Sequence, residues 1–164
     1  MTDPRTAWSH EPAGYDCPFC GLQRGHVNDL NRAADVVAVT DLAYARISPT
    51  WWPVNPGSAL VIPREHHENL YDLPPAAGHA VWDLTERVAV AMRAAYACEG
   101  ISTRQHNEPA GGQDVWHLHV HVLPRHDGDR LYERHREGGY AGPDERVEYA
   151  DRLAAGLALP RTFD

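Results

Sequence analysis

Residues 115–123 (VWHLHVHVL) place a histidine at every second position, at His117, His119 and His121, with apolar residues between them. Successive side chains of a β-strand point to opposite faces of its sheet. The alternation therefore predicts a strand whose three imidazoles share one face, each about 6.6 Å from the next. A single histidine is most often hydrogen-bonded in the core or solvated, but three in strict alternation indicate a functional site.

Two kinds of site use a row of neutral imidazoles. One is a metallohydrolase centre, in which the three histidines bind one metal with an open coordination position. The other is a row that attacks and binds a phosphate group. Residues 111–114 (GGQD) lie directly upstream and form a glycine-rich turn that can direct backbone N–H groups at an anion. An anion beside the imidazoles favours phosphorus chemistry.

The rest of the chain predicts a sheet with two helices. Apolar residues recur every three or four positions in two segments, residues 75–98 and 143–159, which indicates a main amphipathic helix and a C-terminal helix. Besides residues 115–123, β-rich runs occupy residues 35–40, 43–47, 58–62 and 101–106. Strands and helices that do not alternate regularly favour an α+β fold, here a five-stranded antiparallel sheet with helices packed on it.

Three local patterns argue against regular structure. Residues 48–57 contain three prolines and a glycine, so we expect an irregular loop there. Pro63 is expected to end the strand before it, and residues 21–30 have little helical character. The tryptophans at positions 51, 52 and 116 are expected to pack in the fold and not to stack on a base.

Charge and cysteine content restrict the class of protein. Fifteen basic and 23 acidic side chains give a net charge of −8, whereas proteins that bind nucleic-acid phosphates normally carry the opposite sign. No run of about 18 apolar residues occurs and the start of the sequence is polar, so we expect neither a membrane span nor a signal peptide. Three cysteines are too few for a disulfide framework. We expect a cytoplasmic protein with reduced thiols and no nucleic-acid or membrane partner.

The segment GGQDVWHLHVHVLPR, residues 111–125, resembles the signature of the histidine triad (HIT) family, in which His-φ-His-φ-His-φ-φ follows Gly-Gln. Residues 53–70 (PVNPGSALVIPREHHENL) and 17–20 (CPFC) are similar to two further stretches of that family. The resemblance implies a HIT domain at residues 17–125. An N-terminal arm would occupy residues 1–16, and a C-terminal extension, residues 126–164, would pack its helix on the same domain.

The resemblance also implies a reaction. In the HIT family the middle histidine attacks the α-phosphorus of a nucleotide, so His119 is the implied nucleophile and water then cleaves the nucleotidyl-imidazole. His121 matches the histidine that contacts the phosphoryl oxygens, and Gln113 matches the residue near the leaving group. The substrate would be AMP or GMP joined to an amine, an acyl group or, through polyphosphate, a second nucleotide.

Zinc-containing relatives, which include galactose-phosphate uridylyltransferases, imply a metal site at Cys17, Cys20, His66 and His117. Such a Cys₂His₂ set is complete for a closed, structural zinc that would tie the N-terminal arm to the sheet. Packed thiols and a redox Cys-x-x-Cys are the alternatives. Cys98 is expected to be an inert packed thiol.

The implied substrate-binding residues are Thr50, Asn107, Gly112, Gln113, Asp114 and His121. Three positions depart from the family pattern. Ser58 replaces a common histidine, and Thr50 falls where relatives often have a ribose-binding Asn or Asp. Asp114 replaces a Ser or Thr, which puts a carboxylate near an anionic substrate unless it faces a leaving-group amine.

The resemblance leaves three alternatives to hydrolysis by His119 open. A nucleotidylyltransferase or phosphorylase would use the same intermediate but transfer the nucleotidyl group to phosphate or a sugar phosphate. A zinc-stabilised nucleotide-binding protein would keep only vestigial activity, and a metallohydrolase would use the three histidines on one metal. The resemblance also implies a homodimer with a shared sheet.

Overall fold

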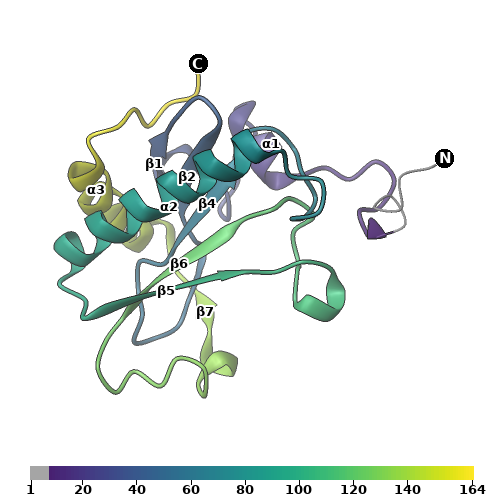
Figure 1. Ribbon diagram of the computed structural model, residues 1–164. Helices are drawn as coiled ribbons and strands as arrows, with labels where there is room; N and C mark the ends of the chain where they lie inside the picture. Colours follow the sequence, from purple (N-terminus) through teal and green to yellow (C-terminus); the bar gives the residue numbers. More distant parts are fainter. Residues whose placement is uncertain (1–7) are drawn as a thin grey trace.

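The computed structural model describes residues 8–164, and residues 1–7 of the expected N-terminal arm lie outside the described residues. Its central feature is a five-stranded antiparallel sheet with strand order β1-β2-β4-β6-β5 (Figure 1). The strands are β1 (Val36–Val39), β2 (Ala43–Ile47), β4 (Ala59–Pro63), β5 (Gly100–Gln105) and β6 (Val120–Arg125). The predicted α+β class and five-stranded antiparallel sheet are confirmed.

Two long helices cover one face of the sheet. The helix α2 (Pro75–Tyr96) crosses the strands, and α3 (Pro143–Leu157) packs beside it against β1 and β2 (Figure 1). The apolar stripe of α2 supplies the core of this layer with Val81, Leu84, Val88 and Met92, all at most 3% exposed. Both helices end where a residue adopts the left-handed conformation.

A second, smaller apolar layer covers the opposite face of the sheet. It is built around the short helix α1 (Pro18–Gln23), whose Phe19 and Leu22 pack against sheet residues that include Tyr44, Leu60 and Ile62. Alternate residues of β4 belong to different layers, because Ala59 and Val61 face the long helices. The strands β1, β2 and β4 are therefore buried on both faces.

The histidine segment is only partly a strand. The predicted strand over residues 115–123 is wrong in its first half, because β6 begins at Val120. The backbone N–H of His117 bonds the nearby Val115 carbonyl at 2.8 Å, and Leu118 N–H bonds the His67 carbonyl at 2.7 Å. These contacts take the place of hydrogen bonds to a neighbouring strand. His117 and His119 therefore lie just before β6, and only His121 lies within it.

Two further local expectations are corrected, and the one for Pro63 is confirmed. A two-residue strand, β3 (Thr50–Trp51), lies inside the loop expected to be irregular and pairs with β7 (Gly139–Tyr140). Pro63 is the last residue of β4, so the strand ends there as expected. The pairing of β4 with β6 reaches only Val61, so the missing proline N–H costs no ladder bond to β6. The helix α1 extends into residues 21–23, where Gly21 and Leu22 are buried.

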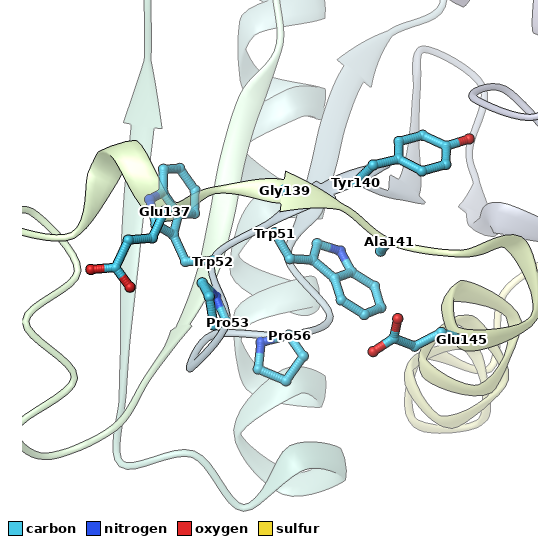
Figure 2. Close-up of a pocket in the computed structure, with 9 residues that line it drawn as sticks. All are labelled: Trp51, Trp52, Pro53, Pro56, Glu137, Gly139, Tyr140, Ala141 and Glu145. Atoms are coloured by element: carbon cyan, nitrogen blue, oxygen red, sulfur yellow. The ribbon is translucent and has the colours of Figure 1, made fainter.

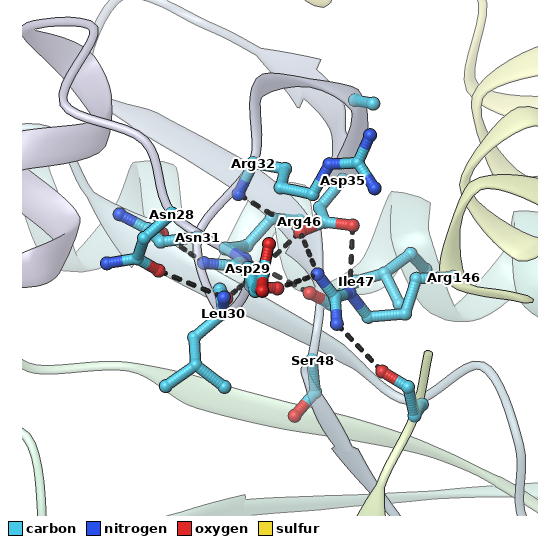
Figure 3. Close-up of polar contacts among 12 residues, drawn as sticks. Asn28, Asp29, Leu30, Asn31, Arg32, Asp35, Arg46, Ile47, Ser48 and Arg146 are labelled. Atoms are coloured by element: carbon cyan, nitrogen blue, oxygen red, sulfur yellow. Dashed lines mark hydrogen bonds and ion pairs between the residues drawn. The ribbon is translucent and has the colours of Figure 1, made fainter. Parts of the chain in front are cut away.

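A buried ion network attaches the C-terminal helix to the sheet (Figure 3). Asp35 accepts from Arg146 of α3 at 3.0 Å and from Arg46 of β2 at 3.1 Å, and each of the three side chains is at most 2% exposed. Arg46 also donates to the main chain of Ile47 and to the side chain of Asn31. Buried charges are tolerated only when paired in this way.

Among the helices of residues 8–164, none combines the length and hydrophobicity that a membrane span requires.

Candidate functional site

A pocket of about 250 Å³ lies on the sheet face that carries α1, beside the start of β6. Two of the predicted imidazoles, His119 and His121, line it. Its apolar walls are Pro18, Phe19, Leu30, Pro49, Leu60 and Val115. Its polar lining consists of Asn28, Asn31, Arg46, Ser48, Thr50 and Asp114. The pocket combines apolar surface, amide and hydroxyl groups, and two imidazoles.

A hydrogen bond fixes the proton of the His119 ring on one nitrogen. Its Nδ1 lies 2.8 Å from the main-chain oxygen of His117. Because a carbonyl can only accept, Nδ1 carries the proton and Nε2 keeps its lone pair. Burial lowers the pKa of His119, so the imidazole is neutral near pH 7. Such a ring can attack an electrophile through Nε2.

His121 stands next to His119, with ring centroids 4.9 Å apart. Burial, followed by the proximity of His119, lowers the pKa of His121 to about 3. The ring is therefore also neutral near pH 7 and can serve as a hydrogen-bonding partner without carrying charge. Phe19 packs edge-on against His119 at a centroid distance of 5.3 Å and limits the space around that ring.

Gln113 does not line the pocket in this structure. Its Nε2 donates to the main-chain oxygens of Glu68 at 2.6 Å and Val115 at 3.0 Å, and its Oε1 accepts from the backbone N–H of Glu108 at 2.8 Å. The side chain is 6% exposed. The amide holds the loop upstream of the histidines in place.

Two more predicted binding residues, Asn107 and Gly112, also lie outside the pocket lining. The Asn107 amide bonds the backbone N–H of Leu70 and the side chain of Gln105. Gly112 has a φ of +87°, and a Cβ there would lie 2.9 Å from Nδ1 of His106. Both residues shape the loop that leads to the histidines.

Thr50 and Asp114 do line the pocket with the two histidines. Thr50 follows Ser48, whose hydroxyl accepts from the Thr50 backbone N–H at 3.3 Å. Ser58, which departs from the family pattern, is 1% exposed and donates to the Asn55 carbonyl at 3.3 Å. Ser58 is therefore buried and bonded to the loop that precedes β4, and it does not line the pocket.

The structure brings the four predicted metal ligands together. One donor atom from each of Cys17, Cys20, His66 and His117 lies within 4.8 Å of the other three. The Nδ1 of His117 is 3.3 Å from Cys17 Sγ and 3.6 Å from Cys20 Sγ, and the Nδ1 of His66 is 3.4 Å from Cys20 Sγ. In a tetrahedral zinc site, sulfur and nitrogen ligands lie about 3.6 Å apart. The donor set fits a tetrahedral zinc ion.

The electrostatics of this cluster favour a thiolate. Hydrogen bonding, chiefly with Cys20, lowers the pKa of Cys17 to about 2. The hydrogen bond with Cys17 is also the main cause that raises the pKa of His66 to about 9. The thiolate is the form of cysteine that binds metals.

His117 connects this cluster to the pocket. Its Nδ1 faces the cysteines, its Nε2 donates to the Pro63 carbonyl at 2.9 Å, and its own carbonyl accepts from His119. Within residues 8–164, the donor group close enough to hold a metal includes neither His119 nor His121. This arrangement does not support one open metal on all three histidines.

The sequence reasoning missed several residues that line the pocket. Asn28, Asn31 and Ser48 supply amide and hydroxyl groups, and Phe19 supplies an aromatic wall. Asn31 is held by a hydrogen bond from its Nδ2 to the Pro18 carbonyl. These residues show no periodicity and come from loops and a one-turn helix, so no local pattern marks them.

A second hollow lies beside the β3–β7 pair and holds neither histidine (Figure 2). It has a volume of about 210 Å³ and is lined by Trp51, Trp52, Pro53, Pro56, Glu137, Gly139, Tyr140, Ala141 and Glu145. Trp51 packs edge-on against Tyr149 at 5.0 Å, and the Arg104 guanidinium stacks 5.0 Å from the Trp52 ring. These indoles do not line the histidine pocket.

Comparison with known families gives a match over the centre of the chain. The family model described as the HIT domain matches residues 30–128. This range includes the pocket histidines and the ligand candidates His66 and His117. It begins after Cys17 and Cys20.

Individual relatives agree with this match. An uncharacterized HIT-like protein of Mycobacterium tuberculosis is 30% identical over 117 residues, which cover 70% of this chain and 75% of that protein. An adenylylsulfatase, HINT3, of Arabidopsis thaliana is 27% identical over 117 residues, covering 71% of this chain and 56% of that protein. The crystal structure of a zinc-bound histidine triad family protein from Mycobacterium smegmatis has a TM-score of 0.70 at 26% identity, covering 87% and 94% of the two chains.

Proposed function

This chain belongs to the HIT domain family, and on that premise we propose that it cleaves a nucleoside monophosphate from a leaving group through a nucleotidyl-histidine intermediate. The observation that carries the proposal is the state of His119, which is neutral, borders the pocket and has Nδ1 bound to a carbonyl. The relative named as an adenylylsulfatase supports a hydrolase of this kind.

The reaction proceeds in two displacements at phosphorus. Nε2 of His119 forms a bond to the α-phosphorus, while the bond from phosphorus to the leaving group breaks and that group departs with the electron pair and takes up a proton. Water then attacks the same phosphorus and gives up a proton, which balances the one taken up by the leaving group; the P–N bond breaks, and the neutral imidazole and a nucleoside monophosphate are released. The His117 carbonyl stabilises the positive charge that the His119 ring carries in the intermediate.

The other predicted site residues support these steps. His121 binds the phosphoryl oxygens beside His119, and Thr50 and Asp114 line the remainder of the pocket. Gln113, Asn107 and Gly112 hold the loop that carries Asp114 and the histidines. The apolar wall that includes Phe19 and Leu60 suits a nucleobase.

The leaving group is joined to AMP or GMP as a phosphoramidate, an acyl phosphate or a polyphosphate. Asp114 favours a phosphoramidate over a polyphosphate chain, because an amine leaves without a negative charge. Asp114 is an exposed carboxylate in the pocket, and the one arginine of the lining, Arg46, is 2% exposed and already bound to Asp35. A polyphosphate would therefore meet a negative charge without an available positive one.

We assign the Cys17, Cys20, His66 and His117 cluster to a structural zinc ion. Zinc would supply a cross-link between the segment before α1 and the segment before β6. The M. smegmatis relative is described as zinc-bound. The four donors would occupy all positions of a tetrahedral ion, which fits a structural role and not a catalytic one.

The proposal also includes a homodimer located in the cytoplasm. β5 is an edge strand of the sheet, and most of its residues are half-exposed. An edge strand has unpaired backbone groups that a strand of a second copy can bond. Light scattering after gel filtration distinguishes a dimer from a monomer.

The test of the function is release of nucleoside monophosphate from a panel of AMP and GMP phosphoramidates, acyl phosphates and dinucleoside polyphosphates. Wild type and His119→Ala are compared with His79→Ala, a control that removes an exposed histidine on α2. We expect release by wild type and the control, and a loss of at least about 10³-fold in His119→Ala. Repeating the assay with added phosphate separates hydrolysis from transfer.

Undiminished turnover in His119→Ala would remove the nucleophile assignment. Tight AMP binding with no turnover of any substrate would favour a binding protein instead.

A further inference from the structure

We propose that Glu11, in the segment before the cysteines, positions His66 for the metal ion and so makes this segment part of the metal centre. The inference rests on the zinc centre proposed above. Glu11 lies outside the residues that match the HIT domain, which begin at residue 30.

The two nitrogens of His66 have different partners. Nδ1 faces Cys20 Sγ at 3.4 Å, and Nε2 lies 2.6 Å from a carboxylate oxygen of Glu11. A carboxylate that accepts a hydrogen bond from Nε2 leaves the lone pair on Nδ1, which is the atom turned toward the cysteines. Outer contacts of this kind select the tautomer of a ligating histidine and fix the plane of its ring.

His117 shows the same arrangement with a different kind of partner. Its Nδ1 faces the cysteines and its Nε2 bonds the Pro63 carbonyl at 2.9 Å. Pro63 belongs to β4, so this outer partner is supplied by the sheet itself. The outer partner of His66 is supplied by a segment that must first dock on the domain.

That segment is docked by contacts on both sides of Glu11. On one side, the Ser9 hydroxyl and the His10 backbone N–H both donate to the Glu68 carboxylate, the latter at 2.6 Å. On the other side, the Tyr15 hydroxyl accepts from the Trp116 backbone N–H at 3.3 Å. Glu68 is only 8% exposed, so its contacts hold residues 9 and 10 firmly.

Residues that contact this segment or the metal centre also contact the loop and the ring of the proposed nucleophile, His119. The main-chain oxygen of Glu68 binds Gln113, and the main-chain oxygen of His117 binds His119. Glu68 and His117 therefore link three features of the molecule. These are the docking of residues 9–15, the occupancy of the metal centre and the orientation of His119. Loss of Glu11 should act first on metal affinity.

The experiment measures zinc affinity of the full chain by competition with a chromophoric chelator, for wild type, Glu11→Ala and Glu11→Gln. The matched control is Asp16→Asn, which removes an exposed carboxylate of the same segment that lies 3.9 Å from Arg24. We expect Glu11→Ala to raise the Kd for zinc about 10- to 100-fold. Asp16→Asn should stay within about threefold of wild type.

Glu11→Gln and a second readout separate positioning from a general loss of structure. Glutamine keeps an oxygen that can accept from Nε2, so its Kd should lie between wild type and Glu11→Ala. Cobalt(II) absorption reports the ligand set directly. We expect an altered ligand-field band in Glu11→Ala, with far-UV circular dichroism unchanged in all variants.

Zinc binding that is equal in Glu11→Ala and Asp16→Asn would overturn the role of Glu11 and leave the zinc centre standing. A folded wild type that binds no zinc would overturn both.

Discussion

At the scale of single residues, the pocket depends on imidazoles that stay neutral. Desolvation lowers the pKa of both His119 and His121 because a buried imidazolium loses its hydration. A neutral His119 keeps the Nε2 lone pair on which the proposed attack depends, and a neutral His121 adds no positive charge beside it. We therefore expect the stability of the protein to respond to acid.

The first prediction concerns stability against pH and His121. In the unfolded chain this histidine has a pKa near 6.5, whereas its folded pKa is about 3. Between these values the unfolded state binds the extra proton, so His121 should reduce the free energy of unfolding by up to about 1.4 kcal/mol per pH unit as pH falls. The groups that face it are His119, Arg104 and His106.

Urea denaturation of wild type and His121→Asn at several pH values between 7.5 and 4.5 measures this contribution. The variant should lose stability less steeply with acid than wild type. His79→Asn, an exposed control, should follow the wild-type slope; identical slopes in all three proteins would contradict the burial of a neutral His121.

The second prediction concerns charge selection by Asp114. Replacing this carboxylate by Asn removes the negative charge that a polyphosphate leaving group would approach. We expect Asp114→Asn to raise kcat/KM for a dinucleoside polyphosphate about fivefold, and to leave an AMP phosphoramidate with an uncharged amine within about twofold. Asp83→Asn on α2 is the matched control. An unchanged ratio between the two substrates would show that Asp114 does not select the leaving group.

At the scale of elements, α3 is attached to the sheet by buried charges as well as by apolar packing. Asp35 is shared by Arg46 and Arg146, two guanidinium groups from elements far apart in sequence (Figure 3). Asn31, which lines the pocket, is a further partner of Arg46. The network therefore connects the C-terminal helix to the pocket wall.

The third prediction is that Asp35→Asn is among the most damaging isosteric changes in the described chain. It leaves two buried guanidinium groups without their shared carboxylate, which should lower the free energy of unfolding by about 3–5 kcal/mol. Asp151→Asn on α3 removes the exposed ion pair with Arg161 and should cost at most about 1 kcal/mol. Equilibrium urea denaturation of the zinc-loaded proteins checks both values, and equal effects would refute a special role for Asp35.

At the scale of the whole molecule, the sheet separates two layers with different tasks. The long helices bury one face, while α1, the metal-ligand cluster and the pocket occupy the other. The second layer is thin, and its apolar cluster contains few residues. Zinc would compensate by cross-linking segments that are about 100 residues apart in the chain.

The fourth prediction follows from this division. Removing zinc with a strong chelator should lower the melting temperature by at least about 8 °C and reduce activity in parallel. Cys17→Ser should mainly lower stability. Differential scanning fluorimetry and the nucleotide-release assay on the same samples provide the comparison. Activity lost at an unchanged melting temperature would instead indicate a catalytic metal.

Periodic patterns in the sequence were sufficient for the main elements. The apolar stripe of α2 and the β-rich runs depend on local side-chain geometry, so they predicted four strands and the two long helices to within two residues at each end. The alternating histidines predicted the fifth strand, but it begins only at Val120. The HIT signature added the candidate nucleophile and the four candidate metal ligands. Local spacing could not show that the chain bends at His117, because that bend arises from contacts with residues 63 and 67.

Only the tertiary structure decided which side chains meet. The distances among Cys17, Cys20, His66 and His117 depend on how α1, β4 and the start of β6 pack together, and no periodicity encodes them. The same holds for the β3–β7 pair, for Asp35 with its two arginines, and for Glu11 against His66. Local sequence determines what each segment prefers to form, whereas the sheet register and the burial of both its faces determine which distant segments become neighbours.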